Sequence, residues 1–265
     1  MNSLMLPKLD LTPFVGPISR PADFLVLQTT QVHPYGRRYI TWDGKVFKYC
    51  RSLGTNLSGY GAANIATQNI AAVPPNAYAA GAEEVLVTIA AADGYAADGV
   101  VAENELQGGY FITGHDEAAV CQTRTILANT AVASGGGTCR LLLDEGLTDA
   151  IATSSYNEIV LNPYRYLSKG SYDYQAFMCV PFRNNTTGYN FWGQTWGPCF
   201  LVPGGGDATP GNTADDRTAY FVGDGSVNFG YALTVENGYQ MAGFCIDNTG
   251  GPVSALPLIM LKLSI

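Results

Sequence analysis

The chain contains two histidines, His33 and His115, and this small number limits the chemistry open to it. Zinc sites and Ser-His-Asp triads both need an imidazole that a second group holds in place. His115 stands in a Gly-His-Asp sequence, but no G-x-S-x-G nucleophile elbow occurs anywhere in the chain. His115 is therefore predicted to be a turn residue, and the protein is predicted not to be an enzyme.

Glycine-rich segments and acidic pairs are the other features that could do chemistry. Residues 134–139 (SGGGTC) and 223–230 (GDGSVNFG) lack the lysine and the following helix of a phosphate-binding loop. Adjacent carboxylates at 144–145 and 215–216 have the chemistry of a calcium site or of glycoside hydrolysis, but no D-x-[DN]-x-[DN]-G loop is present. These positions are predicted to be solvated turns, without a catalytic residue, a metal or a cofactor.

The aromatic segment at residues 189–200 (YNFWGQTWGPCF) is the most distinctive in the chain. Aromatic side chains on a sheet either stack on sugars and bases or form a core strand. Strict alternation would place Trp192, Gln194 and Trp196 on one face and Phe191, Gly193 and Thr195 on the other. One face is expected to pack inward while the other meets a partner.

The amino-acid composition limits the kinds of partner that the protein is expected to bind. Charged residues make up 14% of the 265 residues, against about 25% in a typical domain. A surface so poor in charge favours association with other proteins, although a monomer covered by Ser, Thr, Asn and Gly is an alternative. The net charge of -8 opposes nucleic-acid binding, because phosphates would be repelled. No run of about 18 apolar residues exists, so no membrane span is expected.

Six cysteines, at positions 50, 121, 139, 179, 199 and 245, are widely spaced and form no C-x-x-C motif. The N-terminus (MNSLMLPKLDLTPF) has no signal-peptide pattern, since Pro7, Lys8 and Asp10 break its apolar stretch. Free, mostly buried thiols of a protein made in the cytosol are expected, with pairing as the open alternative.

The elements that must position these residues are predicted to be short strands. Glycine occurs 31 times and is spread over the whole chain, as in a protein with many turns. Residues 38–50 (RYITWDGKVFKYC) predict a hairpin, and Asp43-Gly44 favours a type I′ turn at its tip. Apolar runs recur about every ten residues up to residue 263, whereas helical signals are few and residues 59–72 are the best helix candidate. An all-β fold follows, a β-barrel, β-tulip or sandwich-like structure.

Two segments fall outside this pattern. Residues 1–30 carry prolines at 7, 13, 17 and 21 and predict an extended N-terminal arm that reaches a neighbouring subunit. Residues 203–216 (PGGGDATPGNTADD) predict an exposed loop. Residues 31–265 form the all-β body, either as one domain or as two lobes with a boundary near residue 170.

Four segments in order resemble the capsid decoration, or cement, proteins of tailed phages and viral metagenomes. They are residues 43–49 (DGKVFKY), similar to a D-G-[KR]-V-[FY]-[RK]-Y hairpin; 109–112 (GYFI) with the strand through Thr125, Ile126 and Asn129; 160–164 (VLNPY), similar to L-x-x-N-P-Y; and 189–199, similar to Y-x-W-x-Q-T-W-G-P with Phe191 inserted. The last is the most specific. The six cysteines and the 203–216 loop depart from the family.

The resemblance implies a structural virion protein of a bacteriophage that forms homotrimers on the outer capsid surface. There it would bridge adjacent copies of the major capsid protein and stabilise the icosahedral shell. The candidate interaction residues are Trp192, Trp196, Tyr189, Phe47, Tyr49, Pro7 and Pro13. A receptor- or glycan-binding module of a virion, using the tryptophans to stack on sugar rings, is the alternative, and a virion hydrolase is disfavoured by the few histidines.

Overall fold

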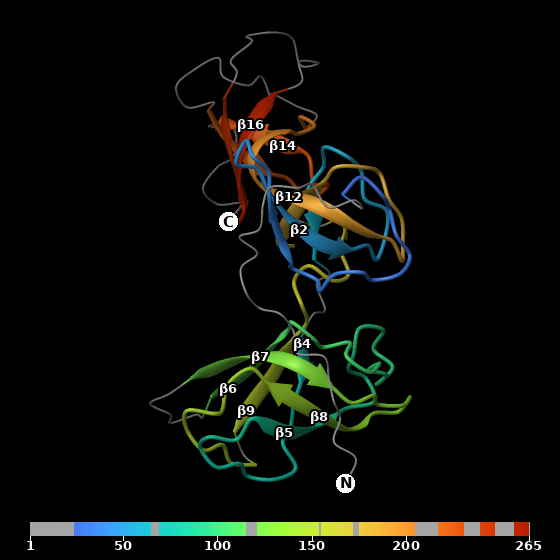
Figure 1. Ribbon diagram of the computed structural model, residues 1–265, viewed down its shortest axis with the longest axis vertical. Coiled ribbons are helices and arrows are strands. Elements are labelled where there is room, and N and C mark those ends of the chain that lie inside the picture. The colour runs from blue at the N-terminus through green and yellow to red at the C-terminus, as the bar shows by residue number, and fades with distance from the viewer. Residues whose placement is uncertain are drawn as a thin grey trace. The chain divides into compact units, whose positions relative to one another are not determined.

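The computed structural model describes residues 24–64, 69–114, 121–153, 155–171, 175–204, 217–230, 239–246 and 257–264 (Figure 1). Over these residues the regular structure consists of β-strands, with no α-helix, and the strands form two curled antiparallel sheets. The predicted all-β fold, of barrel or sandwich-like type, is confirmed. The helix candidate at residues 59–72 instead contains two short strands, β3 (Ala62–Ala63) and β4 (Asn69–Ala71).

The two sheets belong to two compact units of the chain. The described residues between 67 and 163 form the first unit, and those before 67 and after 163 form the second. The first unit is therefore inserted into the chain of the second, with crossings at 66–67 and 163–164. The sequence-based division, a single body or two lobes meeting near residue 170, did not include this insertion.

The first unit is a six-stranded sheet whose edges come together. Its strands follow the order β4-β9-β6-β7-β8-β5, where the further bounds are β5 (Glu84–Ile89), β6 (Tyr110–Gly114), β7 (Gln122–Asn129), β8 (Gly137–Leu143) and β9 (Tyr156–Val160). Just past β4, Val73 accepts a hydrogen bond of 2.8 Å from the Thr88 amide of β5. This bridge joins the two edge strands, so the sheet curls into a small barrel. Alternate residues such as Val85, Val87 and Phe111 fill its interior.

The second unit contains a ten-stranded sheet built around one long strand, β12 (Asn190–Phe200). The other strands are β1 (Arg38–Ile40), β2 (Val46–Arg51), β3, β10 (Ser168–Lys169), β11 (Phe177–Pro181), β13 (Thr218–Phe221), β14 (Val227–Phe229), β15 (Met241–Cys245) and β16 (Leu258–Lys262). β2 pairs with β12 on one edge, while β11 and β16 pair with successive parts of the other edge. β12 therefore connects the aromatic half of the unit to a half-barrel of β16, β15, β13 and β14.

The predicted hairpin at residues 38–50 is present as β1 and β2, but its turn differs from the expected type. The Gly44 amide donates to the Thr41 carbonyl at 2.9 Å, so Trp42 and Asp43 are the central residues of the turn. Gly44 has a φ of +80°, whereas Asp43 is not among the residues with positive φ. The loop is a turn followed by a glycine bulge, because only one residue adopts the left-handed conformation that type I′ requires of two. This geometry places Trp42 at the tip.

An aromatic cluster fills the core beneath β1, β2 and β12. It comprises Phe24, Tyr35, Tyr39, Phe47, Tyr49 and Trp192, with Tyr164 packed against it. The Phe24 ring lies 4.7 Å from the Phe47 ring in an edge-on arrangement and 6.3 Å from Trp192 in a stacked one. The last part of the predicted arm is thus packed into the second unit at Phe24. Residues 1–23, with Pro7 and Pro13, lie outside the described residues.

We expect Phe24→Ala to lower the free energy of unfolding by about 3 kcal/mol, because it empties the middle of this cluster. Phe24 is 5% exposed, whereas its neighbour Leu25 is 38% exposed. Leu25→Ala is the matched control and should cost less than about 1 kcal/mol. Urea denaturation followed by tryptophan fluorescence measures both, and equal costs would show that Phe24 does not anchor the segment.

Candidate interaction surface

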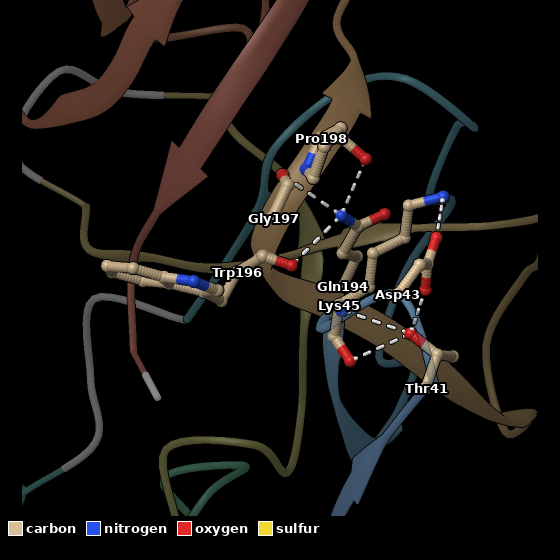
Figure 2. A network of polar contacts seen from close by, with 7 residues as sticks. All are labelled: Thr41, Asp43, Lys45, Gln194, Trp196, Gly197 and Pro198. Carbon is tan, nitrogen blue, oxygen red and sulfur yellow. Dashed lines mark hydrogen bonds and ion pairs between the residues drawn. The ribbon is translucent and has the colours of Figure 1, made fainter.

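β12 changes the direction of its side chains at a bulge, and this decides which of its residues face outward. Gln194 pairs with Phe47 and Trp196 pairs with Val46, so Thr195 is an extra residue with no register partner on β2. The Thr195 hydroxyl donates to the Ser264 carbonyl at 2.8 Å and lies 3.5 Å from the Val46 carbonyl. Figure 2 shows the Trp196 indole pointing away from the Gln194 side chain. The expected common face for Trp192, Gln194 and Trp196 is therefore wrong, because a bulge shifts the alternation by one residue.

Polar contacts of the Gln194 side chain stabilise the strand at this bulge (Figure 2). The Gln194 amide nitrogen lies 3.1, 3.2 and 3.0 Å from the carbonyl oxygens of Trp196, Gly197 and Pro198. These carbonyls belong to the three consecutive residues that follow the bulge. Gln194 is buried, so its amide nitrogen finds its hydrogen-bond partners in the backbone instead of in water.

The tip itself is braced by Asp43. Its carboxylate accepts a hydrogen bond from the Thr41 hydroxyl and pairs with the Lys45 ammonium at 3.0 Å. The Thr41 hydrogen bond, followed by the one from Lys45, lowers the pKa of Asp43. Because the folded-state pKa is lowered, this carboxylate stabilises the tip above its ordinary pKa, and the contribution disappears as the pH falls through the lowered value. Trp42, at the tip, is 85% exposed.

Beyond the bulge, the outward sides of β12, β16 and β15 form a continuous apolar surface. Directly paired residues of neighbouring strands share a face, so Phe200 lies beside Leu258, and Pro198 lies beside Met260 and Phe244. Ile246 lies beside Leu258 on the same face, since its amide donates to the Leu258 carbonyl at 2.8 Å. We call this set the outer face: Pro198, Phe200, Phe244, Ile246, Leu258 and Met260.

The outer face is exposed and almost uncharged. Phe200, Phe244, Ile246 and Leu258 each expose 38 to 44% of their surface. The intervening residues Ile259 and Leu261 point the other way and are fully buried in the half-barrel core. Lys262 is the charged residue among the outward positions of these three strands. Its ammonium lies 4.9 Å from the Phe244 ring centre. Contiguous exposed apolar surfaces of this kind are typical of interaction sites, which makes the outer face the candidate here.

The structure buries some of the predicted interaction residues in the core and leaves others partly exposed. Trp192, Phe47 and Tyr49 are at most 3% exposed and pack in the aromatic cluster, so a partner could reach them only if that core opened. Tyr189 and Trp196 are half-buried. Trp196 follows the bulge in register with Lys262, next to the outer face.

The residues that sequence reasoning missed are those of the outer face and Trp42. β16 (LIMLK) and the end of β15 carry apolar residues at consecutive positions, and such strands are apolar on both sides. In an antiparallel sheet with one solvated face, that pattern indicates an exposed apolar surface. Trp42 directly precedes Asp43-Gly44, and a bulky apolar residue at a turn has few neighbours to cover it.

Among the other positions that could do chemistry, His33 and Asp144 make structural contacts. His33 contacts the Tyr49 and Trp192 rings at 5.1 and 5.4 Å between ring centres. The Asp144 carboxylate, just after β8, accepts a hydrogen bond of 2.9 Å from the Thr125 amide of β7. His115 and residues 215–216 lie outside the described part of the chain. Within that part no group of three potential metal ligands occurs, and no helix is long and apolar enough to cross a membrane.

The six cysteines are free, and five of them are buried. The sulfur atoms of Cys50 and Cys179 are 3.7 Å apart, although β12 lies between their strands. They meet because Gly193, between them, has no side chain. Burial raises the pKa of Cys179 well above its ordinary value, and raises the pKa of Cys199 to about 12. The thiols of Cys179 and Cys199 are therefore protonated and weakly reactive.

We expect all six thiols to react with a thiol reagent in denaturant without reductant, and the exposed Cys121 to react fastest in the folded protein. Strands two positions apart are separated by about 9.6 Å, beyond the roughly 7 Å between Cα atoms that a disulfide allows. A count of four thiols, with a peptide linking positions 50 and 179, would contradict this assignment.

Comparisons with known proteins give no relative for this chain: no family model, no curated protein and no solved structure matches it. The resemblance to capsid decoration proteins stays a prediction.

Proposed function

We propose that this protein is a non-enzymatic structural component of a phage virion that decorates and stabilises the icosahedral capsid. In this proposal the outer face docks on the capsid surface, against the major capsid protein. The observation that supports the proposal most directly is this exposed, nearly uncharged apolar surface on the sheet. The low charge of the chain and the ordered resemblance of four segments to decoration proteins support it further.

The energetics of decoration suit such a surface. Covering an apolar side chain contributes about 25 cal/mol per Å² removed from water, so a few half-exposed residues give a modest energy at each site. A shell repeats the site many times, and a homotrimer that binds through three copies at once gains further from multivalency. No bond is made or broken in this function.

An add-back experiment tests the proposal. Heads that lack this chain are mixed with the purified protein, separated by density gradient and analysed for bound protein, with and without heating or low-salt stress. Saturable binding at a stoichiometry set by the lattice, together with greater resistance of the heads to stress, is expected. Failure to bind expanded heads at micromolar protein would refute decoration.

The N-terminal arm is proposed to reach a neighbouring subunit in the same assembly. Because Phe24 belongs to the aromatic core, the truncation that tests the arm must end before it. Removal of residues 1–20 should reduce binding to heads while leaving the thermal unfolding of the body unchanged. Full occupancy by the truncated protein would show that the arm has no role in docking.

The glycan-binding alternative has to use a site other than Trp192. Its indole is enclosed by Phe24, Tyr39 and Tyr49 and offers no free ring face to a sugar. A different part of the chain provides a groove with suitable chemistry.

A further inference from the structure

A groove of about 490 Å³ lies on the outer side of the first unit. Its lining comes from β5, β8, the loop after β4 and the residue after β7: Asn76, Tyr78, Glu84, Leu86, Thr130, Thr138 and Arg140. The volume is within the range of small-ligand sites. It is separate from the outer face, which belongs to the second unit.

Tyr78 is held rigidly as one wall of the groove. Its backbone exchanges two hydrogen bonds of 2.9 Å with Ile151, and its hydroxyl accepts the Leu86 amide at 2.8 Å. That amide lies on the edge of β5 opposite β8, where the Thr88–Val73 bridge also forms, and the Tyr78 hydroxyl is its acceptor. The half-exposed ring and the Leu86 side chain form an apolar surface. Because the ring is already held in place, it loses little conformational entropy when a ligand binds.

The polar groups of the groove are balanced in charge and in hydrogen-bonding type. Arg140 pairs with Glu84 at 2.9 Å, with 41% and 53% of the side chains exposed, so the groove carries no net charge. The guanidinium retains further N–H donors, and the Glu84 carboxylate retains acceptor capacity. Within the described part of the chain the Asn76 amide and the Thr138 hydroxyl make no hydrogen bond. Both types of partner are thus offered to a ligand.

We propose that this groove binds a neutral saccharide. A sugar hydroxyl both donates and accepts, as the Arg140–Glu84 pair and Asn76 require, and the C–H face of a pyranose ring fits against Tyr78 and Leu86. An anionic ligand would gain little, because Glu84 already neutralises Arg140. The site goes beyond capsid decoration and does not depend on it.

The test uses the purified chain and soluble malto-, cello-, chito- and manno-oligosaccharides of about four to six units. Binding is followed by chemical-shift changes and by calorimetry up to about 10 mM sugar. At least one neutral sugar should bind, with an affinity that changes little between about 0.05 and 0.5 M salt. Thr138→Tyr, which fills the groove from an exposed strand position, should weaken binding by about tenfold or more.

Thr123→Tyr is the matched control, because Thr123 is an exposed threonine on β7 of the same barrel and does not line the groove. It should leave the affinity unchanged. Asn76→Ala, in an exposed loop, should weaken binding without affecting folding. The proposal is overturned if none of these neutral sugars binds, if Thr138→Tyr and Thr123→Tyr behave alike, or if only sialylated or sulfated sugars bind. Loss of head binding in the add-back experiment would leave this result unaffected.

Discussion

Gly193→Ala is expected to lower the free energy of unfolding of the second unit by more than about 3 kcal/mol. Gly193 lies on β12 between β2 and β11, and a methyl group there would overlap the Cys179 sulfur and lie 2.7 Å from its Cβ. Cys179 is fully buried and already touches Cys50, so it has no free space to move into. β12 itself would have to shift, and it pairs with three other strands. Chemical denaturation measures the effect.

Two further variants identify the cause of this destabilisation. Cys179→Ala in the Gly193→Ala background should restore part of the stability, because it removes the sulfur that the new methyl group meets. Gly114→Ala, a strand glycine whose nearest neighbour would be the Cys121 sulfur at 3.3 Å, should cost less than about 1 kcal/mol. A Gly193→Ala protein as stable as the Gly114→Ala protein would show that the two cysteines are not packed across β12 as described.

The double variant Phe244→Ser with Leu258→Ser is expected to weaken binding to phage heads by tenfold or more, on the order of at least 1.4 kcal/mol. Both side chains project from the outer face, so their replacement removes apolar contact area without opening the core behind them. Unfolding free energy should change by less than about 1 kcal/mol. The add-back assay gives the affinity, and denaturation gives the stability.

Tyr156→Ser provides the control for surface hydrophobicity in general. Tyr156 is 69% exposed on β9 of the first unit, whereas the outer face belongs to the second unit. Its replacement should leave head binding intact. If the Tyr156 variant loses binding and the double variant keeps it, docking takes place through another surface and the role assigned to β12, β15 and β16 is wrong.

Local patterns in the sequence were sufficient for much of the secondary structure. The hairpin at residues 38–50 followed from Asp43-Gly44 between aromatic and β-branched runs, and Phe47 and Tyr49 do share the face that packs in the core. The turn type was wrong because dipeptide preference does not determine whether one or both residues take positive φ. The hydrogen bond from Gly44 to Thr41 selects the one-residue solution.

Long-range features were beyond local patterns. The pairing of β2 with β12 joins residues about 140 positions apart, and nothing in either strand specifies the other. The bulge at Thr195 depends on this pairing, so the direction of Trp196 could not be predicted from alternation. The insertion of the first unit likewise depends on contacts between distant segments. Trp192 was taken for a surface residue because core and surface aromatics have the same alternation along a strand.

A cryo-EM reconstruction of the virus heads tests the central proposal most directly. The proposal predicts density for this chain at lattice positions on the outside of the icosahedral shell, with the strands β12, β16 and β15 turned toward coat protein and Phe244 and Leu258 covered. Heads without such density, or bound copies whose Phe244 and Leu258 face solvent, would contradict it.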